Sequence, residues 1–124
     1  MSKSKVLIID DHAQTRQLVK WALAESGFEI HEASNGFSGL AMARHLKPGL
    51  ILLDVVMPGD RDGYQVCAEL RADDTLGAVK IVLLSSNDRP EDRARGQQSG
   101  ANAYLTKPFK PASLRGVVAK LLGA

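Results

Sequence analysis

The chain has 124 residues and a net charge of +2, from 16 Lys and Arg against 14 Asp and Glu. Its basic residues are scattered, which argues against a stripe for nucleic acid or a membrane surface. The single cysteine, Cys67, excludes an internal disulfide framework, and no apolar run reaches membrane-spanning length. We therefore expect one domain over residues 1–124, in the cytoplasm and with no membrane contact.

Taken in order, the chain first shows an apolar run at 6–9, which predicts a strand buried on both faces. This run ends in Asp10-Asp11. Apolar residues at helical spacing over 18–23 predict the first helix. Residues 28–33 alternate between apolar and polar, which is typical of a strand near a sheet edge.

A second helix, with Phe37 on its apolar side, precedes another fully apolar run at 50–53. That run ends in Asp54. Because an ionised Asp is rarely buried without a partner, its place at the end of a buried strand needs a structural or a chemical reason. A third helix follows at about 64–71, with Asp62 available as its N-cap.

The third fully apolar run, at 81–84, ends in Ser85. The segment 90–99 is polar almost throughout, so a helix there would be weakly anchored and able to move. A short mixed strand at 103–106 leads to Lys107, and an amphipathic helix follows.

Five strands thus alternate with five helices, which predicts an α/β fold with a doubly wound parallel sheet and helices on both faces. The three fully apolar strands should be central and the two mixed strands should form the edges. The strand order 2-1-3-4-5 is consistent with this.

Polar side chains follow the ends of four strands, and in such a sheet these ends lie along one edge, where ligands bind. They belong to Asp10, Asp11, Asp54, Ser85 and Lys107. Singly, each permits a structural role: a helix cap, a backbone hydrogen bond or an ion pair. Together they indicate a site in which repulsion raises carboxylate pKa values and Mg²⁺ relieves it.

This set also suits phosphoryl transfer. A carboxylate such as Asp54 needs no general base to act as a nucleophile at neutral pH. The cation and Lys107 would neutralise the charge of the incoming phosphoryl group.

From about residue 5 to 122 the chain resembles the receiver domain of bacterial two-component response regulators, which have a flavodoxin-like fold. Each matching motif is weak alone, but the ordered set is highly specific. The motifs are Asp10-Asp11 after Ile8-Ile9, Asp54 followed by Met57-Pro58, Asp62-Gly63, Ser85, Gly100-Ala101 and Tyr104-Leu105-Thr106-Lys107-Pro108-Phe109.

The resemblance implies that Asp54 is the phosphoacceptor, which takes a phosphoryl group from the phosphohistidine of a sensor kinase or phosphotransfer protein. The implied ligands of Mg²⁺ or Mn²⁺ are Asp11 directly, Asp10 mainly through water, Asp54 and the backbone carbonyl of Val56. Lys107 would contact the acceptor and then the phosphoryl group.

Two further residues are implied to transmit the signal. The hydroxyl of Ser85 would move toward the phosphoryl group, and Tyr104 would follow it inward as an aromatic switch. The surface of the fourth helix, fifth strand and fifth helix would then control an effector, and this is compatible with dimerisation on activation. The resemblance further implies a cis Lys107-Pro108 bond.

The expected function is therefore a phosphoprotein switch and not an enzyme, apart from assisting its own phosphorylation and dephosphorylation. No direct nucleic-acid binding is expected. A Mg²⁺-dependent phosphohydrolase is the first alternative, although dehalogenase-like phosphatases need a second acid where this chain has Val56. A flavin carrier is disfavoured because Asp10-Asp11 would repel phosphate. A pseudo-receiver binding module is disfavoured by the complete residue set.

Two departures from the family pattern stand out. The loop Gly59-Asp60-Arg61 is one residue longer than the commonest spacing, so it should bulge beside the metal. Val56 and Asn87 occupy the positions that tune dephosphorylation in the family. An apolar Val56 cannot orient a hydrolytic water, so we expect a long-lived phosphorylated state.

Other conspicuous residues are assigned structural roles. His12, His31 and His45 share no ligand spacing, which argues against a zinc site, and His12 is expected to be a solvated loop residue at the edge of the pocket. Cys67 is assigned to the core. Trp21 is assigned to the edge of the core in preference to contact with a partner. The cluster of Arg89, Arg93 and Arg95 is assigned to a solvated face.

Overall fold

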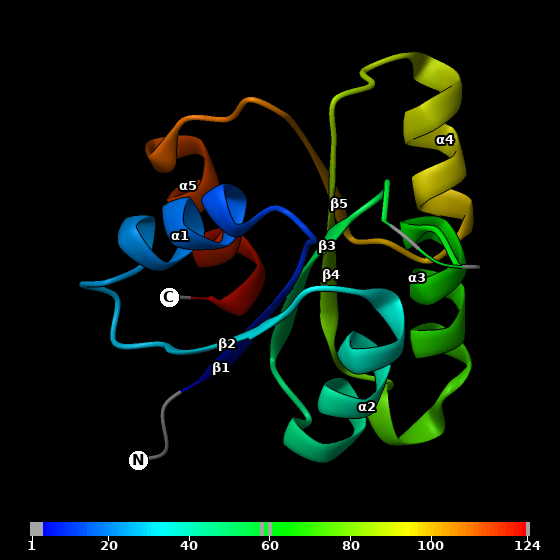
Figure 1. Cartoon of the computed structure of the whole chain (residues 1–124), viewed down its shortest axis with the longest axis horizontal. Coiled ribbons are helices and arrows are strands. Elements are labelled where there is room, and N and C mark those ends of the chain that lie inside the picture. Colours follow the sequence, from blue (N-terminus) through cyan, green and yellow to red (C-terminus); the bar gives the residue numbers. More distant parts are fainter. Residues whose placement is uncertain (1–3, 58, 60, 124) are drawn as a thin grey trace.

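The computed structural model describes residues 4–57, 59 and 61–123, in which strands and helices alternate along the chain (Figure 1). The strands are β1 (Lys5–Ile9), β2 (Glu29–Ala33), β3 (Leu50–Asp54), β4 (Lys80–Ser85) and β5 (Ala103–Thr106). The helices are α1 (Ala13–Ala22), α2 (Gly36–Leu46), α3 (Gly63–Ala72), α4 (Pro90–Gln98) and α5 (Pro111–Leu122), with a short 3₁₀ helix, η1 (Asp74–Leu76), before β4.

The strands form one parallel sheet in the order β2-β1-β3-β4-β5, as predicted. The fully apolar strands β1, β3 and β4 are central, and their register places Leu7 beside Ile51 and Ile51 beside Ile81. Helices α1 and α5 cover one face of the sheet, and α2, α3 and α4 cover the other (Figure 1). Both faces of the central strands are therefore shielded from water, which is why these strands are apolar throughout.

Alternate residues of each central strand supply two separate cores. Val6 and Ile8 pack into the cluster that includes residues of α1 and α5. Leu7 and Ile9 pack into the cluster that includes residues of α2 and α3. All four side chains are fully buried, so β1 is held from both sides and the position of its carboxyl end is fixed.

The start of α3 is fixed against the end of β3. Asp62 caps α3 as predicted, because its side chain accepts from Gln65 N over 2.9 Å while the Gln65 side chain accepts from Asp62 N over 2.8 Å. A Cβ at Gly63 would overlap the backbone carbonyl oxygen of Asp54 and lie 2.6 Å from Val55 Cα. Only glycine permits this close approach, which places the helix directly behind Asp54.

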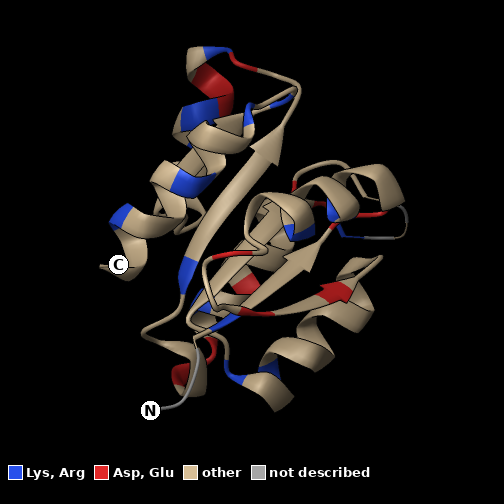
Figure 2. Cartoon of the chain, turned by 90° about the vertical axis from the view of Figure 1, so that its left-hand side faces the viewer, with Lys and Arg blue, Asp and Glu red and all other residues tan. Residues whose placement is uncertain are grey.

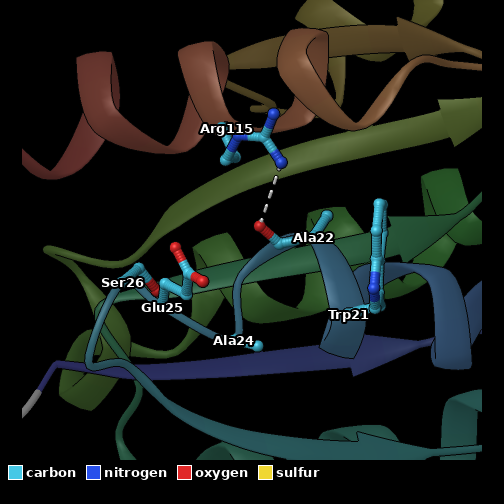
Figure 3. A pocket seen from close by; sticks show the side chains of 6 residues that line it. All are labelled: Trp21, Ala22, Ala24, Glu25, Ser26 and Arg115. Carbon is cyan, nitrogen blue, oxygen red and sulfur yellow. Dashed lines mark hydrogen bonds between the residues drawn. The ribbon is translucent and has the colours of Figure 1, made fainter.

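Two aromatic assignments were wrong. Trp21 is 68% exposed and Phe37 is 77% exposed. Trp21 lies on the outer side of α1, where it lines a cavity with Arg115, whose Nη1 donates to Ala22 O over 3.4 Å (Figure 3). Phe37 points to solvent because α2 approaches the sheet through small residues, and a Cβ at Gly39 would lie 2.5 Å from Ile9 Cδ1. The inner face of α2 has no room there for an aromatic ring.

Helix α4 is weakly anchored, as its composition predicted, since Gly96 is its one buried residue among those described. Ala94, the main apolar residue of this polar segment, is exposed. A Cβ at Gly96 would lie 3.0 Å from Leu83 Cδ1 and 3.1 Å from the Tyr104 ring, so the helix backbone rests directly on both side chains. Cys67 is buried in the core, as expected. Among the described residues, no helix combines the length and apolarity needed to cross a membrane.

Candidate functional site

Three buried polar side chains mark the carboxyl edge of the central strands. Asp10 is fully buried, Asp54 is 3% exposed and Ser85 is 2% exposed. Asp10 directly follows β1, whereas Asp54 and Ser85 are the last residues of β3 and β4. Lys107 directly follows β5, and its backbone N–H donates to Ser85 O over 2.7 Å. The structure thus brings together side chains that the sequence places far apart.

Lys107 joins two of the carboxylates. Its Nζ donates to Asp10 Oδ2 over 2.8 Å and to Asp54 Oδ1 over 3.1 Å. The Lys107 side chain is 16% exposed, so these ion pairs lie in a region with little water. The structural role predicted for Lys107 alone was an ion pair with one acid, whereas Lys107 contacts two. The bond between Lys107 and Pro108 is cis, as the resemblance implied.

The other oxygens of the two carboxylates face a second set of groups. His12 Nδ1 lies 3.0 Å from Asp10 Oδ1, 3.2 Å from Asp11 Oδ1 and 4.0 Å from Asp54 Oδ2. Asp54 Oδ2 is buried and has no hydrogen-bond partner among the residues that the structure describes. A buried anionic oxygen without a partner is costly, so this atom indicates a place for a cation or another ligand.

The pKa directions reflect this crowding. Burial and the negative charge of Asp10 raise the pKa of Asp54, and Lys107 only partly offsets them. Burial alone would lower the pKa of Lys107, but its contacts with Asp10 and Asp54 outweigh burial and raise it. The pKa of Asp54 is thus raised in the direction predicted, with burial as the larger cause and repulsion by Asp10 as the second.

The donor set fits a divalent cation. One ligand atom each from Asp10, Asp11, His12 and Asp54 lies within 4.8 Å of the others. Mg²⁺ and Mn²⁺ prefer carboxylate oxygens, and the orphaned Asp54 Oδ2 is one of those available here. Neither acid of the Asp10-Asp11 pair caps α1, because the N-cap is His12 and no side chain caps the helix. The carboxylates therefore remain available to the pocket.

His12 is the member of this group that the sequence did not single out as a ligand. Its side chain is 62% exposed, as expected for a loop residue, yet Nδ1 points at the carboxylates. Its position directly after Asp11 was the one signal in the sequence. His31 lies elsewhere, on β2, with Nε2 2.8 Å from Glu29 Oε2.

A short chain of hydrogen bonds leads away from the pocket. Ser85 Oγ accepts from Asn87 N over 3.1 Å, and the Tyr104 hydroxyl donates to Asn87 O over 2.9 Å. The Arg93 guanidinium lies 5.1 Å from the centroid of the Tyr104 ring. The loop after β4 therefore connects Ser85 with Tyr104 on the side of α4.

The remaining predicted features lie at the surface. The Val56 side chain, two residues after Asp54, is 67% exposed. The bulge predicted for Gly59-Asp60-Arg61 falls on a loop in which Asp60 and the preceding Pro58 lie outside the described residues. The arginines at the start of α4 and within it are exposed, and Arg93 pairs with the exposed Asp88 at 2.5 Å, which confirms a solvated face. In the view of Figure 2, Lys and Arg lie on several separate elements.

Comparison with known proteins decides the family. Residues 6–119 match the family model described as the response regulator receiver domain. The chain belongs to this family. As a receiver domain it is 35% identical over 114 residues to PilG of Pseudomonas aeruginosa, which covers 92% of this chain and 84% of PilG. The structure of the chemotaxis protein CheY4 of Vibrio cholerae matches with a TM-score of 0.90 and 30% identity, over 97% of this chain and 99% of that one.

Two other relatives of this receiver domain bear on the site and on the chain's context. The receiver domain of a sensor histidine kinase from Pseudomonas aeruginosa PAO1, solved with a magnesium ion coordinated in its active site cleft, matches with a TM-score of 0.88 and 28% identity, over 99% of this chain and all of that one. The DNA-binding regulator RpaA of Synechocystis is 38% identical over 105 residues, which are 85% of this chain and 43% of RpaA. The chain spans less than half the length of the first curated relatives that it matches.

Membership of the family confirms the predicted fold and places the chain in two-component signalling. Response regulators interact with histidine kinases and with downstream effectors, and their receivers are signalling domains. The two alternatives, a phosphohydrolase and a pseudo-receiver binding module, are not favoured. The roles of individual residues, the metal and the absence of nucleic-acid binding remain predictions.

Proposed function

We propose that this chain is a single receiver domain that acts in the cytoplasm as a phosphorylation-dependent switch, with Asp54 as the phosphoacceptor. One observation carries the proposal: Asp54 is 3% exposed at the end of β3, with Lys107 Nζ 3.1 Å from Oδ1 and no hydrogen-bond partner for Oδ2 among the described residues. A structural acid would have both oxygens satisfied. An acceptor needs one oxygen available to the incoming phosphorus.

The transfer is a displacement at phosphorus. A new bond forms between an Asp54 carboxylate oxygen and the phosphorus, while the bond from phosphorus to the donor's leaving atom breaks. The donor is a phosphohistidine of a sensor kinase or phosphotransfer protein, or a small acyl phosphate. Lys107, already fixed between Asp10 and Asp54, contributes positive charge next to the phosphoryl oxygens without reorganising.

A divalent cation, Mg²⁺ or Mn²⁺, supplies the remaining positive charge when bound. The residues that would hold it are Asp10, Asp11 and Asp54, with the backbone carbonyl of Val56. The fit rests on the carboxylate oxygens of Asp10 and Asp54 that Lys107 does not use. The magnesium ion in the related kinase receiver supports the choice of metal.

The output follows from the connections of Ser85. Phosphorylation adds close to two negative charges and strong acceptor oxygens beside Ser85 Oγ. If that hydroxyl turns toward them, it leaves Asn87 N, and the loop that also accepts the Tyr104 hydroxyl is released to move. Helix α4 rests on Tyr104 through Gly96, so the surface of α4, β5 and α5 changes with it and controls an effector or a dimer contact. The domain itself needs no nucleic-acid contact for this.

The test is phosphorylation by acetyl phosphate, followed by intact mass and Phos-tag gel. Wild type should gain one phosphoryl group with Mg²⁺ and none with excess chelator, and Asp54→Asn should gain none. Asp74→Asn, an exposed acid on η1 before β4, is the matched control and should behave as wild type. Labelling of Asp54→Asn at the wild-type rate would refute the acceptor assignment. Continuous release of phosphate from a simple phosphate ester would instead indicate a phosphohydrolase.

A further inference from the structure

The orientation of His12 is the starting point. Its backbone N–H donates to Asp10 Oδ1 over 2.9 Å, and its ring turns Nδ1 to 3.0 Å from the same oxygen. Nδ1 is also 3.2 Å from Asp11 Oδ1. The imidazole thus stands at the mouth of the carboxylate pocket with one nitrogen directed inward, although 62% of the side chain is exposed.

These separations suit ligands of one metal ion. With metal–ligand bonds of about 2.1 Å, neighbouring atoms of an octahedron are about 3.0 Å apart and opposite atoms about 4.2 Å apart. His12 Nδ1 lies 3.0 and 3.2 Å from the Asp10 and Asp11 oxygens and 4.0 Å from Asp54 Oδ2. An independent observation points to a ligand at the same place, because Asp54 Oδ2 is buried without a hydrogen-bond partner among the described residues.

The chemistry of imidazole distinguishes between metals. Mg²⁺ takes oxygen ligands and gains little from a nitrogen. Imidazole suits Co²⁺, Ni²⁺, Cu²⁺ and Zn²⁺, whose affinities for mixed nitrogen and oxygen sites exceed those for carboxylates alone. Nδ1 would bind through its lone pair, with the ring proton on Nε2.

We propose that His12 is a direct ligand, through Nδ1, of late first-row transition metals in this pocket. The preference of the chain for these metals over Mg²⁺ is then greater than the carboxylates alone would give. The inference rests on the proposed function in one respect, namely that the carboxylates hold a divalent cation. It extends that function, because a transition metal bound with His12 competes with Mg²⁺ and makes metal identity an input to the switch.

The test compares His12→Ala with wild type in calorimetric titrations with CoCl₂, NiCl₂ and MgCl₂. His31→Ala is the matched control, since His31 also lies beside a carboxylate but on β2. Loss of a direct ligand should weaken Co²⁺ and Ni²⁺ binding by about tenfold or more, at least as much as loss of an outer-shell partner. Mg²⁺ affinity should change by less than about twofold. His31→Ala should match wild type for all three ions.

A second measurement identifies the ligand atom. With one equivalent of Cu²⁺, pulsed electron paramagnetic resonance should show imidazole nitrogen coupling in wild type and in His31→Ala, and not in His12→Ala. Circular dichroism checks that His12→Ala is folded. Asp11→Asn should weaken both Mg²⁺ and Co²⁺ binding, since a carboxylate serves either metal.

The outcomes separate the two proposals. Equal Co²⁺ affinity in wild type and His12→Ala overturns the role of His12. An imidazole nitrogen coupling in His12→Ala equal to that of wild type also overturns it. Equal weakening of Mg²⁺ and Co²⁺ also overturns it, because His12 would then act by positioning Asp10. If Mg²⁺-dependent phosphorylation is intact in each of these cases, the proposed function stands. Absence of binding by every divalent ion, together with absence of phosphorylation, overturns both.

Discussion

Lys107 Nζ lies 2.8 Å from Asp10 Oδ2, an ion pair between residues 97 positions apart in the chain. Asp10 follows a central strand and Lys107 follows an edge strand on the other side of β3 and β4. The pair forms only when these strand ends share one edge of the sheet. It therefore ties the electrostatics of the pocket directly to the fold.

Replacing Lys107 with Met should destabilise the protein. The change leaves Asp10 and Asp54 buried without their ammonium partner, and breaking a buried pair typically costs about 3 kcal/mol or more. Urea unfolding at neutral pH measures this loss, and Mg²⁺ should restore part of it. Lys120→Met, at an exposed position of α5, should change stability little, and a similar loss in both variants would contradict the prediction.

The wild-type contribution of Lys107 also has a definite pH dependence. Because the pKa of Lys107 is raised in the folded state, the folded chain holds the proton more tightly than the unfolded chain. The contribution of Lys107 to the free energy of unfolding is complete below the ordinary lysine pKa. This contribution is lost as the pH rises through the raised pKa of the folded state. Lys107→Met should lack this alkaline loss of stability.

Replacing Asp54 with Asn should stabilise the protein at neutral pH in the absence of divalent ions. The pKa of Asp54 is raised, so wild-type stability falls as the pH rises from the ordinary carboxyl pKa through the raised one. The free energy of unfolding should therefore be higher for the Asn variant than for wild type at neutral pH. Thermal melts should show the gain at neutral pH and a smaller one in acid. An Asn variant less stable than wild type at neutral pH would be inconsistent with this sign.

Two glycines should respond oppositely to alanine. A Cβ at Gly63 would lie 2.6 Å from Val55 Cα, so Gly63→Ala should cost about 2–3 kcal/mol and displace the end of β3. A Cβ at Gly116, within α5, has nothing within 4 Å, so Gly116→Ala should stabilise the helix by about 0.5–1 kcal/mol. Urea midpoints measure both effects. Equal effects at the two positions would show that the close approach at Gly63 is unimportant.

The exposed Val56 predicts slow loss of the phosphoryl group. An apolar side chain two residues after the acceptor cannot hold a water in line for attack on phosphorus. The phosphorylated state of Val56→Gln should therefore have a lifetime several-fold shorter than that of phosphorylated wild type. The lifetime is measured by loss of the phosphorylated mass after the donor is removed. Val56→Thr, which keeps the branched shape, is the control. A rapidly decaying wild type would show that another group positions the water.

The sheet and most of the pocket could be predicted because their signals are local. Strands covered on both faces must be apolar throughout, and the strand-end residues Asp10 and Asp54 are fixed in position by that sheet. The rotation of a helix about its own axis has no such local signal, because it depends on contacts with other elements. Phe37 points outward because Gly39 contacts Ile9, and nothing within α2 itself encodes that contact.

The direction of the His12 ring illustrates the same limit within the pocket. Its proximity to Asp11 was evident from the chain, but its inward nitrogen depends on Asp10 accepting from the His12 backbone. The exposed Trp21 also depends on how α1 packs beside α5, where Arg115 reaches the Ala22 carbonyl (Figure 3). Side-chain directions of this kind follow from contacts between elements.

The single buried glycine of α4 has a consequence for recognition. Since Gly96 is the one residue of α4, among those described, that is buried, the free-energy well that holds this helix in place is shallow. A partner that binds α4 can therefore shift this helix without exposing buried apolar side chains of the helix. A side chain added at position 96 would instead crowd the Leu83 and Tyr104 side chains, which would have to shift by a few tenths of an ångström. The same face can therefore adapt its shape to different partners while the sheet beneath it stays rigid.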